Sequence, residues 1–153
     1  MSLIIREATP DDAPVIAEFN SLMSSETEGR PLDKSLVLAG VRNLIGDSQK
    51  GHYFVADVAG QVVGQLMLTF EWSDWRNGVQ WWIQSVYIHE DFRRQWVFSA
   101  LYGHVESLAR NDSSVCGIRL YVEENNARTR ETYRNLGMSE PGFLVMEVDF
   151  REQ

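Results

Sequence analysis

The stretch VYIHEDFRRQWVFSAL, residues 86–101, is the part of the chain that decides the fold. An apolar strand ends at Ile88, a polar turn follows, and apolar residues at helical spacing begin at Val97. A helix start leaves backbone N–H groups unpaired and carries a partial positive charge, which suits a phosphate. Arg93 and Arg94 can add charge-assisted hydrogen bonds. Taken alone, the pattern favours an ordinary strand-to-helix turn with solvated arginines.

The elements on either side of this stretch alternate between strand and helix periods. Strands are expected at residues 3–5, 53–58, 62–70, 79–88, 118–122 and 143–150, and helices at residues 9–23, 37–45, 97–108 and 127–136. Residues 24–31 are polar and predict a loop, and Asn77-Gly78 is a strong turn signal. The order β-α-α-β-β-β-α-β-α-β predicts an α/β fold in which helices pack on a mixed sheet.

Composition limits the class of protein and its surroundings. The 153 residues, 44% of them hydrophobic, fit one soluble domain spanning residues 1–153. The net charge of −8 disfavours a nucleic-acid partner. No apolar run reaches the roughly 20 residues that span a bilayer, and no secretion signal is visible, so we expect no membrane association and a cytoplasmic location. The single Cys116 excludes an internal disulfide and is expected to be a small core residue.

A second pair of residues lies in the expected helix at residues 127–136 and just before it. Asn126 and Tyr133 are seven residues apart, which is two helical turns, so their side chains share one face. An Asn can bind an amide and a Tyr hydroxyl can give a proton. In isolation this pair favours a capping Asn and a core Tyr.

Taken in this order, the two pieces resemble the GNAT superfamily of acetyl-CoA-dependent N-acetyltransferases over nearly the whole chain. The family's R/Q-x-x-G-x-G/A signature corresponds to RRQWVF at residues 93–98. Its later Asn and Tyr before a Leu-Gly-Phe-like end correspond to Asn126 and Tyr133 before Leu136-Gly137-Met138. The resemblance implies the GNAT fold, a mixed and mostly antiparallel central sheet with helices on both faces.

The resemblance also implies a mechanism for an acetyl-CoA-dependent N-acetyltransferase. The acceptor amine attacks the thioester directly, a backbone N–H near Tyr87 or Ile88 polarises the carbonyl, and Tyr133 protonates the departing thiolate. Acetyl-CoA lies where the strand ending at Ile88 splays from the strand at residues 118–122, with its pyrophosphate on backbone N–H groups of residues 95–99. The cofactor-binding residues so implied are Val86, Tyr87, Ile88, Arg93, Arg94, Gln95, Trp96, Val97, Phe98, Ser99 and Asn126.

Two departures from the family pattern leave an alternative open. Trp96 and Phe98 stand where the signature has glycines, whose use is close approach of the backbone to phosphate. Some members carry a basic carboxylate on the strand before the signature, but this chain has Trp81, Trp82 and Gln84 there. The alternative is a GNAT-fold module that binds an acyl-CoA or a protein partner without turnover. The candidates for a base elsewhere are Glu71, Asp74, Glu26 and Glu28, of which Glu71 is assigned the catalytic role.

The acceptor is expected to be a primary amine of a small molecule or a peptide. Its predicted contacts come from the first interhelical loop and the hairpin, namely Glu26, Glu28, Trp72, Asp74 and Trp75. The hairpin tryptophans include Trp81 and Trp82, which lie on opposite faces of their strand. They form an acceptor wall, part of the core or an interface between two copies, and at least one is expected to be structural. With the family's habit they indicate a homodimer. The three histidines lack metal-ligand spacing, so no metal is expected.

Overall fold

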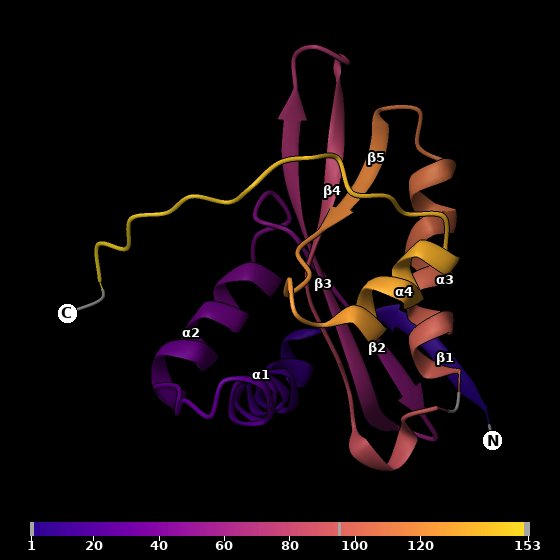
Figure 1. Ribbon diagram of the computed structural model, residues 1–153. Helices are drawn as coiled ribbons and strands as arrows, with labels where there is room; N and C mark the ends of the chain where they lie inside the picture. The colour runs from indigo at the N-terminus through magenta and orange to yellow at the C-terminus, as the bar shows by residue number, and fades with distance from the viewer. Residues whose placement is uncertain (1, 95, 152–153) are drawn as a thin grey trace. The chain divides into compact units, whose positions relative to one another are not determined.

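The computed structural model describes residues 2–94 and 96–151, which fall into two compact units, Met1–Tyr121 and Val122–Gln153. The first unit is built on a five-stranded sheet in the order β1-β2-β3-β4-β5 (Figure 1). Its pairs are antiparallel except β4 with β5, which is parallel. The sheet is therefore mixed and mostly antiparallel, as predicted. The strands are β1 (Leu3–Glu7), β2 (His52–Val58), β3 (Gln61–Ser73), β4 (Gly78–Ile88) and β5 (Val115–Leu120).

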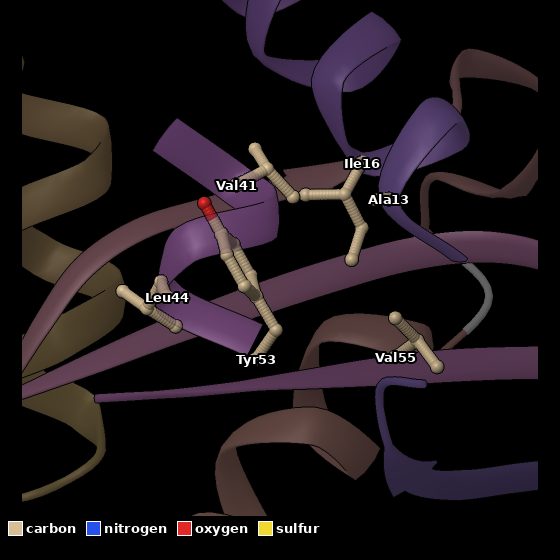
Figure 2. Packing of buried hydrophobic residues seen from close by; sticks show 6 residues of the cluster. All are labelled: Ala13, Ile16, Val41, Leu44, Tyr53 and Val55. Carbon is tan, nitrogen blue, oxygen red and sulfur yellow. The ribbon is translucent and has the colours of Figure 1, made fainter. Parts of the chain in front are cut away.

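Helices cover both faces of this sheet. After a short 3₁₀ turn, η1 (Pro10–Asp12), α1 (Ala13–Thr27) and α2 (Lys34–Ile45) lie on one side, and α3 (Val97–Arg110), which follows the 3₁₀ turn η2 (Glu90–Phe92), lies on the other (Figure 1). Successive side chains of β2 face opposite sides of the sheet, so they belong to two separate parts of the core. Tyr53 and Val55 pack with residues of α1 and α2 (Figure 2), whereas the Phe54 ring contacts His104 of α3. The prediction of helices on both faces is confirmed.

An ionic network joins β1 to η1 at the start of the chain. Arg6 donates to Asp12 at 2.7 and 3.1 Å through two guanidinium nitrogens and to Asp57 at 3.2 Å through Nε. Asp12 is buried and also accepts from the backbone N–H of Thr9 at 2.7 Å. The hydrogen bond from Arg6 is the main reason that the pKa of Asp12 is lowered. The carboxylate is thus satisfied on both oxygens, and it fixes the entry into α1.

We expect Asp12→Asn to lower the free energy of unfolding by about 2 kcal/mol, the worth of a hydrogen bond to a charged group. Because the folded-state pKa of Asp12 is depressed, its stabilisation is present above the unfolded-state pKa of about 3.9 and is lost as the pH falls through the folded-state value. Urea unfolding at pH 7 and at low pH measures this, with the exposed Asp11→Asn as control. A difference that persists unchanged at low pH would contradict the ionic origin.

The second unit contains α4 (Ala127–Asn135), which starts at the predicted residue and ends one residue before the predicted end. The Asn126 side chain caps its first turn, and Gly137 follows it with φ +95°. The predicted strand at residues 143–150 is wrong, because none of the described residues forms a strand there. Its apolar side chains are largely exposed, Met146 by 94%. Apolar residues favour burial, but a strand also needs a partner for its backbone groups.

Two further expectations differ from the structure in the first unit. The helix α1 continues to Thr27, beyond the predicted loop start at Ser24, because local hydrogen bonds satisfy its polar residues. The Ser24 hydroxyl donates to the carbonyl of Arg30 at 2.9 Å, and the Thr27 hydroxyl donates to the carbonyl of Met23 at 2.8 Å. Cys116 is exposed on β5, the last strand of the sheet, and is not a core residue. None of the described helices is long and apolar enough to cross a bilayer.

Candidate active site

The C-terminal half of β4 leaves the pairing with β5. The parallel register runs from Val79 opposite Val115 to Ile83 opposite Leu120, where β5 ends. The pairing of β4 with β3 changes register at the same place. Ser85 pairs with Met67 and Ile83 pairs with Leu68, so Gln84 is an extra residue on β4 with no partner in the register. Such a bulge bends a strand and changes its twist. From Gln84 onward, no strand among the described residues pairs with this edge of β4.

The backbone groups that face this open edge belong to Val86 and Ile88. The N–H of His89 donates to the carbonyl of Val63 in β3 at 2.8 Å. Because bonded and non-bonded residues alternate in an antiparallel ladder, Tyr87 also turns its N–H toward β3. Val86 and Ile88 then turn theirs to the open side. Consistently, the Ile88 carbonyl accepts from Arg93 Nε at 2.9 Å instead of from β3.

A pocket of about 380 Å³ lies beside this end of β4. Its walls come from the end of α1, the end of β4, the turn after it and the start of α3. Most of its lining is apolar, and one carboxylate and one guanidinium supply the charges. The lining residues are Met23, Glu26, Thr27, Val86, Tyr87, Ile88, Arg93 and Phe98. The structure therefore gathers five of the eleven predicted cofactor residues and one predicted acceptor residue around one cavity.

Glu26, Tyr87 and Arg93 form a hydrogen-bonded cluster at this pocket. The Tyr87 hydroxyl donates to Glu26 Oε2 at 2.5 Å, and Arg93 Nη2 donates to Glu26 Oε1 at 2.8 Å. The Arg93 guanidinium carbon lies 5.2 Å from the centre of the Tyr87 ring. The centres of the Tyr87 and Phe19 rings are 5.1 Å apart. The cluster joins the last turn of α1 to the end of β4 across 61 residues of sequence.

The electrostatics of the cluster assign a different role to each member. The hydrogen bond from Tyr87, followed by that from Arg93, lowers the pKa of Glu26. Burial, with help from the Glu26 carboxylate, raises the pKa of Tyr87 to about 12. Glu26 is therefore an anion throughout the neutral range and Tyr87 remains a proton-bearing donor. A general base works best with a pKa near the working pH, so Glu26 fits the binding of a cation better than proton removal.

The turn between β4 and α3 is built by two non-glycine residues in left-handed conformation. Arg94 has φ +65° and Trp96 has φ +69°. Trp96 stands directly before α3, and its own side chain makes no capping hydrogen bond. The predicted phosphate site, which consists of the backbone N–H groups of Val97, Phe98 and Ser99, belongs to the first turn of α3. Gln95, the remaining predicted residue of the turn, lies outside the described residues.

The predicted acceptor residues of the β3–β4 hairpin lie far from the pocket. Trp72 pairs with Val79, which is eight residues before Tyr87 on β4, or about 26 Å at the usual rise of a strand. Asp74 and Trp75 lie still closer to the hairpin tip, and both are exposed. Glu71, the predicted base, instead accepts from Arg119 Nη1 of β5 at 2.9 Å. None of these four residues lines the pocket.

Other predicted residues have different partners. Glu28 is exposed beyond the end of α1 and does not line the pocket. The Trp81 ring contacts Phe70, whereas the Trp82 ring lies 4.6 Å from Tyr121, so the two tryptophans serve different contacts. Within residues 2–94 and 96–151, no three His, Cys, Asp or Glu side chains gather as metal ligands do.

In the second unit, α4 carries the other predicted pair. Asn126 Oδ1 accepts from the backbone N–H of Thr129 at 3.1 Å, so its carbonyl oxygen serves as the cap of α4. Tyr133 is half-buried on the last turns of the same helix. Asn126 is thus the cap in front of the helix that carries Tyr133, so the predicted capping Asn is confirmed, but Asn126 is not itself a helical residue on the face of Tyr133.

Sequence reasoning missed the α1 wall of the pocket, Met23 and Thr27. One signal in the sequence could have found this wall. Residues 15–28 contain no Gly or Pro, so nothing in the sequence stops the helix before Glu26, the residue that contacts Tyr87.

The comparisons with known proteins agree with this geometry. The model of the acetyltransferase (GNAT) family matches residues 16–138. The crystal structure of a possible acetyltransferase from Clostridium difficile 630 is 41% identical, with a TM-score of 0.93, and the match covers 99% of this chain and 100% of that one. The chain therefore belongs to the acetyltransferase (GNAT) family.

More distant solved structures share the fold alone. A ribosomal-protein-alanine N-acetyltransferase from Brucella melitensis biovar Abortus 2308 is 15% identical with a TM-score of 0.75, and the match covers 97% of this chain and 100% of that one. An aminoglycoside N-acetyltransferase in complex with CoA is 13% identical with a TM-score of 0.78, covering 97% of this chain and 95% of that one. No match was found among curated protein sequences.

Proposed function

We propose that the protein is an acetyl-CoA-dependent N-acetyltransferase that acts on a primary amine of a small molecule or a peptide by direct attack in a ternary complex. The observation that carries the proposal is the open edge of β4 from Gln84 to Ile88, which ends beside both the pocket and the first turn of α3. An extended ligand with amides along its length and phosphates at one end fits this sequence of features. Acetyl-CoA is such a ligand and, when bound, supplies an acetyl group activated as a thioester.

The residues of the first unit divide the binding between them. The pantetheine arm runs along Val86 and Ile88, where Val86 offers its backbone N–H and C=O groups to an amide of the arm, and the N–H groups of residues 97–99 offer a phosphate site. Of the two residues considered as the oxyanion donor, Ile88 is supported, because its N–H faces the open edge whereas that of Tyr87 faces β3. The transfer also needs a proton for the sulfur leaving group, and we assign this role to the Tyr133 hydroxyl.

For the acceptor we infer a cationic amine that Glu26 attracts. An alkyl amine with a pKa near 10 is an ammonium ion at neutral pH in all but about one part in a thousand, so a carboxylate at the pocket favours its approach. The fold neighbours include proteins named for ribosomal-protein alanine and for aminoglycosides, so the fold is compatible with peptide and small-molecule amines. The proton of the ammonium is assigned to water, because Glu26 holds too low a pKa to take it.

The test is calorimetric titration with acetyl-CoA and with CoA, followed by a panel of amines in which thiol release is measured. Micromolar binding with amine-dependent thiol release is the expected result. Binding without release for any amine would favour the alternative, a GNAT-fold module without turnover. No binding at millimolar CoA would contradict both.

We also propose that residues 1–153 form one GNAT domain that acts as a cytoplasmic homodimer. The family match crosses both compact units, which supports one domain. The exposed Trp72 and Trp75 near the hairpin tip supply apolar surface for a partner copy. Light scattering of the purified protein tests the dimer, and a monomeric mass would contradict it.

Replacing Glu26 by Gln is expected to strengthen CoA binding about two- to fivefold at low salt, because the removal of one negative charge leaves Arg93 to attract the phosphates. The amide retains an acceptor for the Tyr87 hydroxyl, so the pocket keeps its shape. The matched control is Glu71→Gln, which removes the same charge from a carboxylate that pairs with Arg119 at 2.9 Å far from the pocket, and it should leave CoA affinity unchanged. Calorimetry at two salt concentrations measures both. Weaker CoA binding in Glu26→Gln would contradict the charge argument.

A further inference from the structure

Trp96 is a large apolar residue that packing does not explain. It exposes 84% of its surface, although it adopts a left-handed conformation that costs an ordinary residue about 1 kcal/mol. A glycine would relieve that cost. An aromatic residue that is both exposed and held in a strained backbone conformation points to a role in binding, because neither feature adds to stability.

Phe98, the other bulky residue of this turn, is accounted for by packing. It is half-buried and lines the pocket, and its ring lies 6.2 Å from that of Tyr102 on the next turn of α3. The packing of α3 therefore accounts for Phe98. Trp96 stands instead at the N-cap of α3, and its side chain is exposed to solvent and accessible to a ligand.

We propose that Trp96 is the stacking surface for the adenine ring of the bound acetyl-CoA. This inference rests on the proposed function, since it takes the diphosphate to lie at the first turn of α3. In CoA the adenosine is joined directly to the diphosphate, so one ribose separates the base from the groups that hold the phosphates. An exposed indole beside those groups offers the largest flat side chain for a purine, and stacking of a base on an aromatic residue contributes strongly to nucleotide affinity.

A second exposed tryptophan, two substitutions of Trp96 and a ligand without adenine serve as controls for this proposal. Trp75 is equally exposed, by 92%, but lies at the hairpin tip about 26 Å or more along β4 from Tyr87. It is the matched control for a general effect of losing a surface indole. Substitution of Trp96 by Gly keeps the left-handed turn accessible, whereas Phe keeps an aromatic face. A ligand without adenine, 4′-phosphopantetheine, reports whether the turn itself still binds phosphate.

The experiment measures the affinities of CoA and 4′-phosphopantetheine by calorimetry for the wild type and for Trp96→Gly, Trp96→Phe and Trp75→Ala. Trp96→Gly should weaken CoA binding about tenfold or more and leave 4′-phosphopantetheine within about twofold, while Trp96→Phe retains most of the CoA affinity. Trp75→Ala should change neither affinity. CoA should also quench the fluorescence of the wild type more than that of Trp96→Phe, and 4′-phosphopantetheine should quench both alike.

Each other outcome overturns the proposal in a distinguishable way. If Trp96→Gly binds CoA as tightly as the wild type, Trp96 does not stack on the base, although the proposed function stands. If both ligands weaken equally, Trp96 acts through the backbone of the turn. If the wild type binds no CoA at all, the proposed function fails and the inference fails with it.

Discussion

Replacing Tyr133 by Phe is expected to lower kcat at least 100-fold, because one hydroxyl that donates a proton in the transition state contributes about a hundred- to ten-thousandfold. The substitution removes a single oxygen and keeps the ring, so α4 should fold as before. CoA affinity, measured by calorimetry, should stay within about twofold, since a proton donor to the leaving group acts on turnover and not on ground-state binding. The measurement is thiol release with the best amine of the panel.

The control for this variant is Tyr121→Phe, which removes the same atom from an exposed tyrosine whose ring contacts Trp82. It should retain kcat within about twofold. A fully active Tyr133→Phe would show that another group protonates the sulfur. A loss of CoA affinity equal to the loss of kcat would indicate that Tyr133 supports the fold of the site instead of the chemistry.

The fold was predictable from the sequence where an element depends on local residues alone. The hairpin of β3 and β4, the cap at Asn126 and the left-handed Gly137 follow from turn and helix chemistry that needs no distant partner. The strand expected at residues 143–150 failed because its apolar residues state only a preference for burial, whereas strand formation requires a second backbone to pair with. Sequence periodicity contains no information on that partner.

The candidate site was predictable for its backbone groups and less so for its side chains. The position of Val86 and Ile88 follows from the end of a strand before a helix, and the bulge at Gln84 then frees their edge. The cluster of Glu26 with Tyr87 and Arg93 depends on contacts across 61 and 67 residues of sequence, which no local pattern reports. Hence Arg93 was predicted to face phosphate, while the structure shows it bound to a carboxylate.

The structure gives the backbone N–H of Ile88 a separate test, because this group lies on an edge where proline removes no ladder hydrogen bond. Ile88→Pro should lower kcat about 100-fold or more, the usual effect of removing one oxyanion donor. Ile88→Ala shortens the side chain but keeps the N–H, and it should stay within about fivefold of the wild type, since only apolar contact is lost.

Three measurements make this pair of variants decisive. Circular dichroism and thermal unfolding show whether Ile88→Pro keeps the sheet, calorimetry shows whether it still binds CoA, and thiol release gives kcat. A folded Ile88→Pro that binds CoA but turns over slowly assigns the lost rate to the N–H, because the alanine variant accounts for the side chain. If the two variants lose the same activity, the side chain of Ile88 matters and its N–H does not. If Ile88→Pro acetylates at the wild-type rate, the oxyanion must be stabilised by a group other than the open edge of β4.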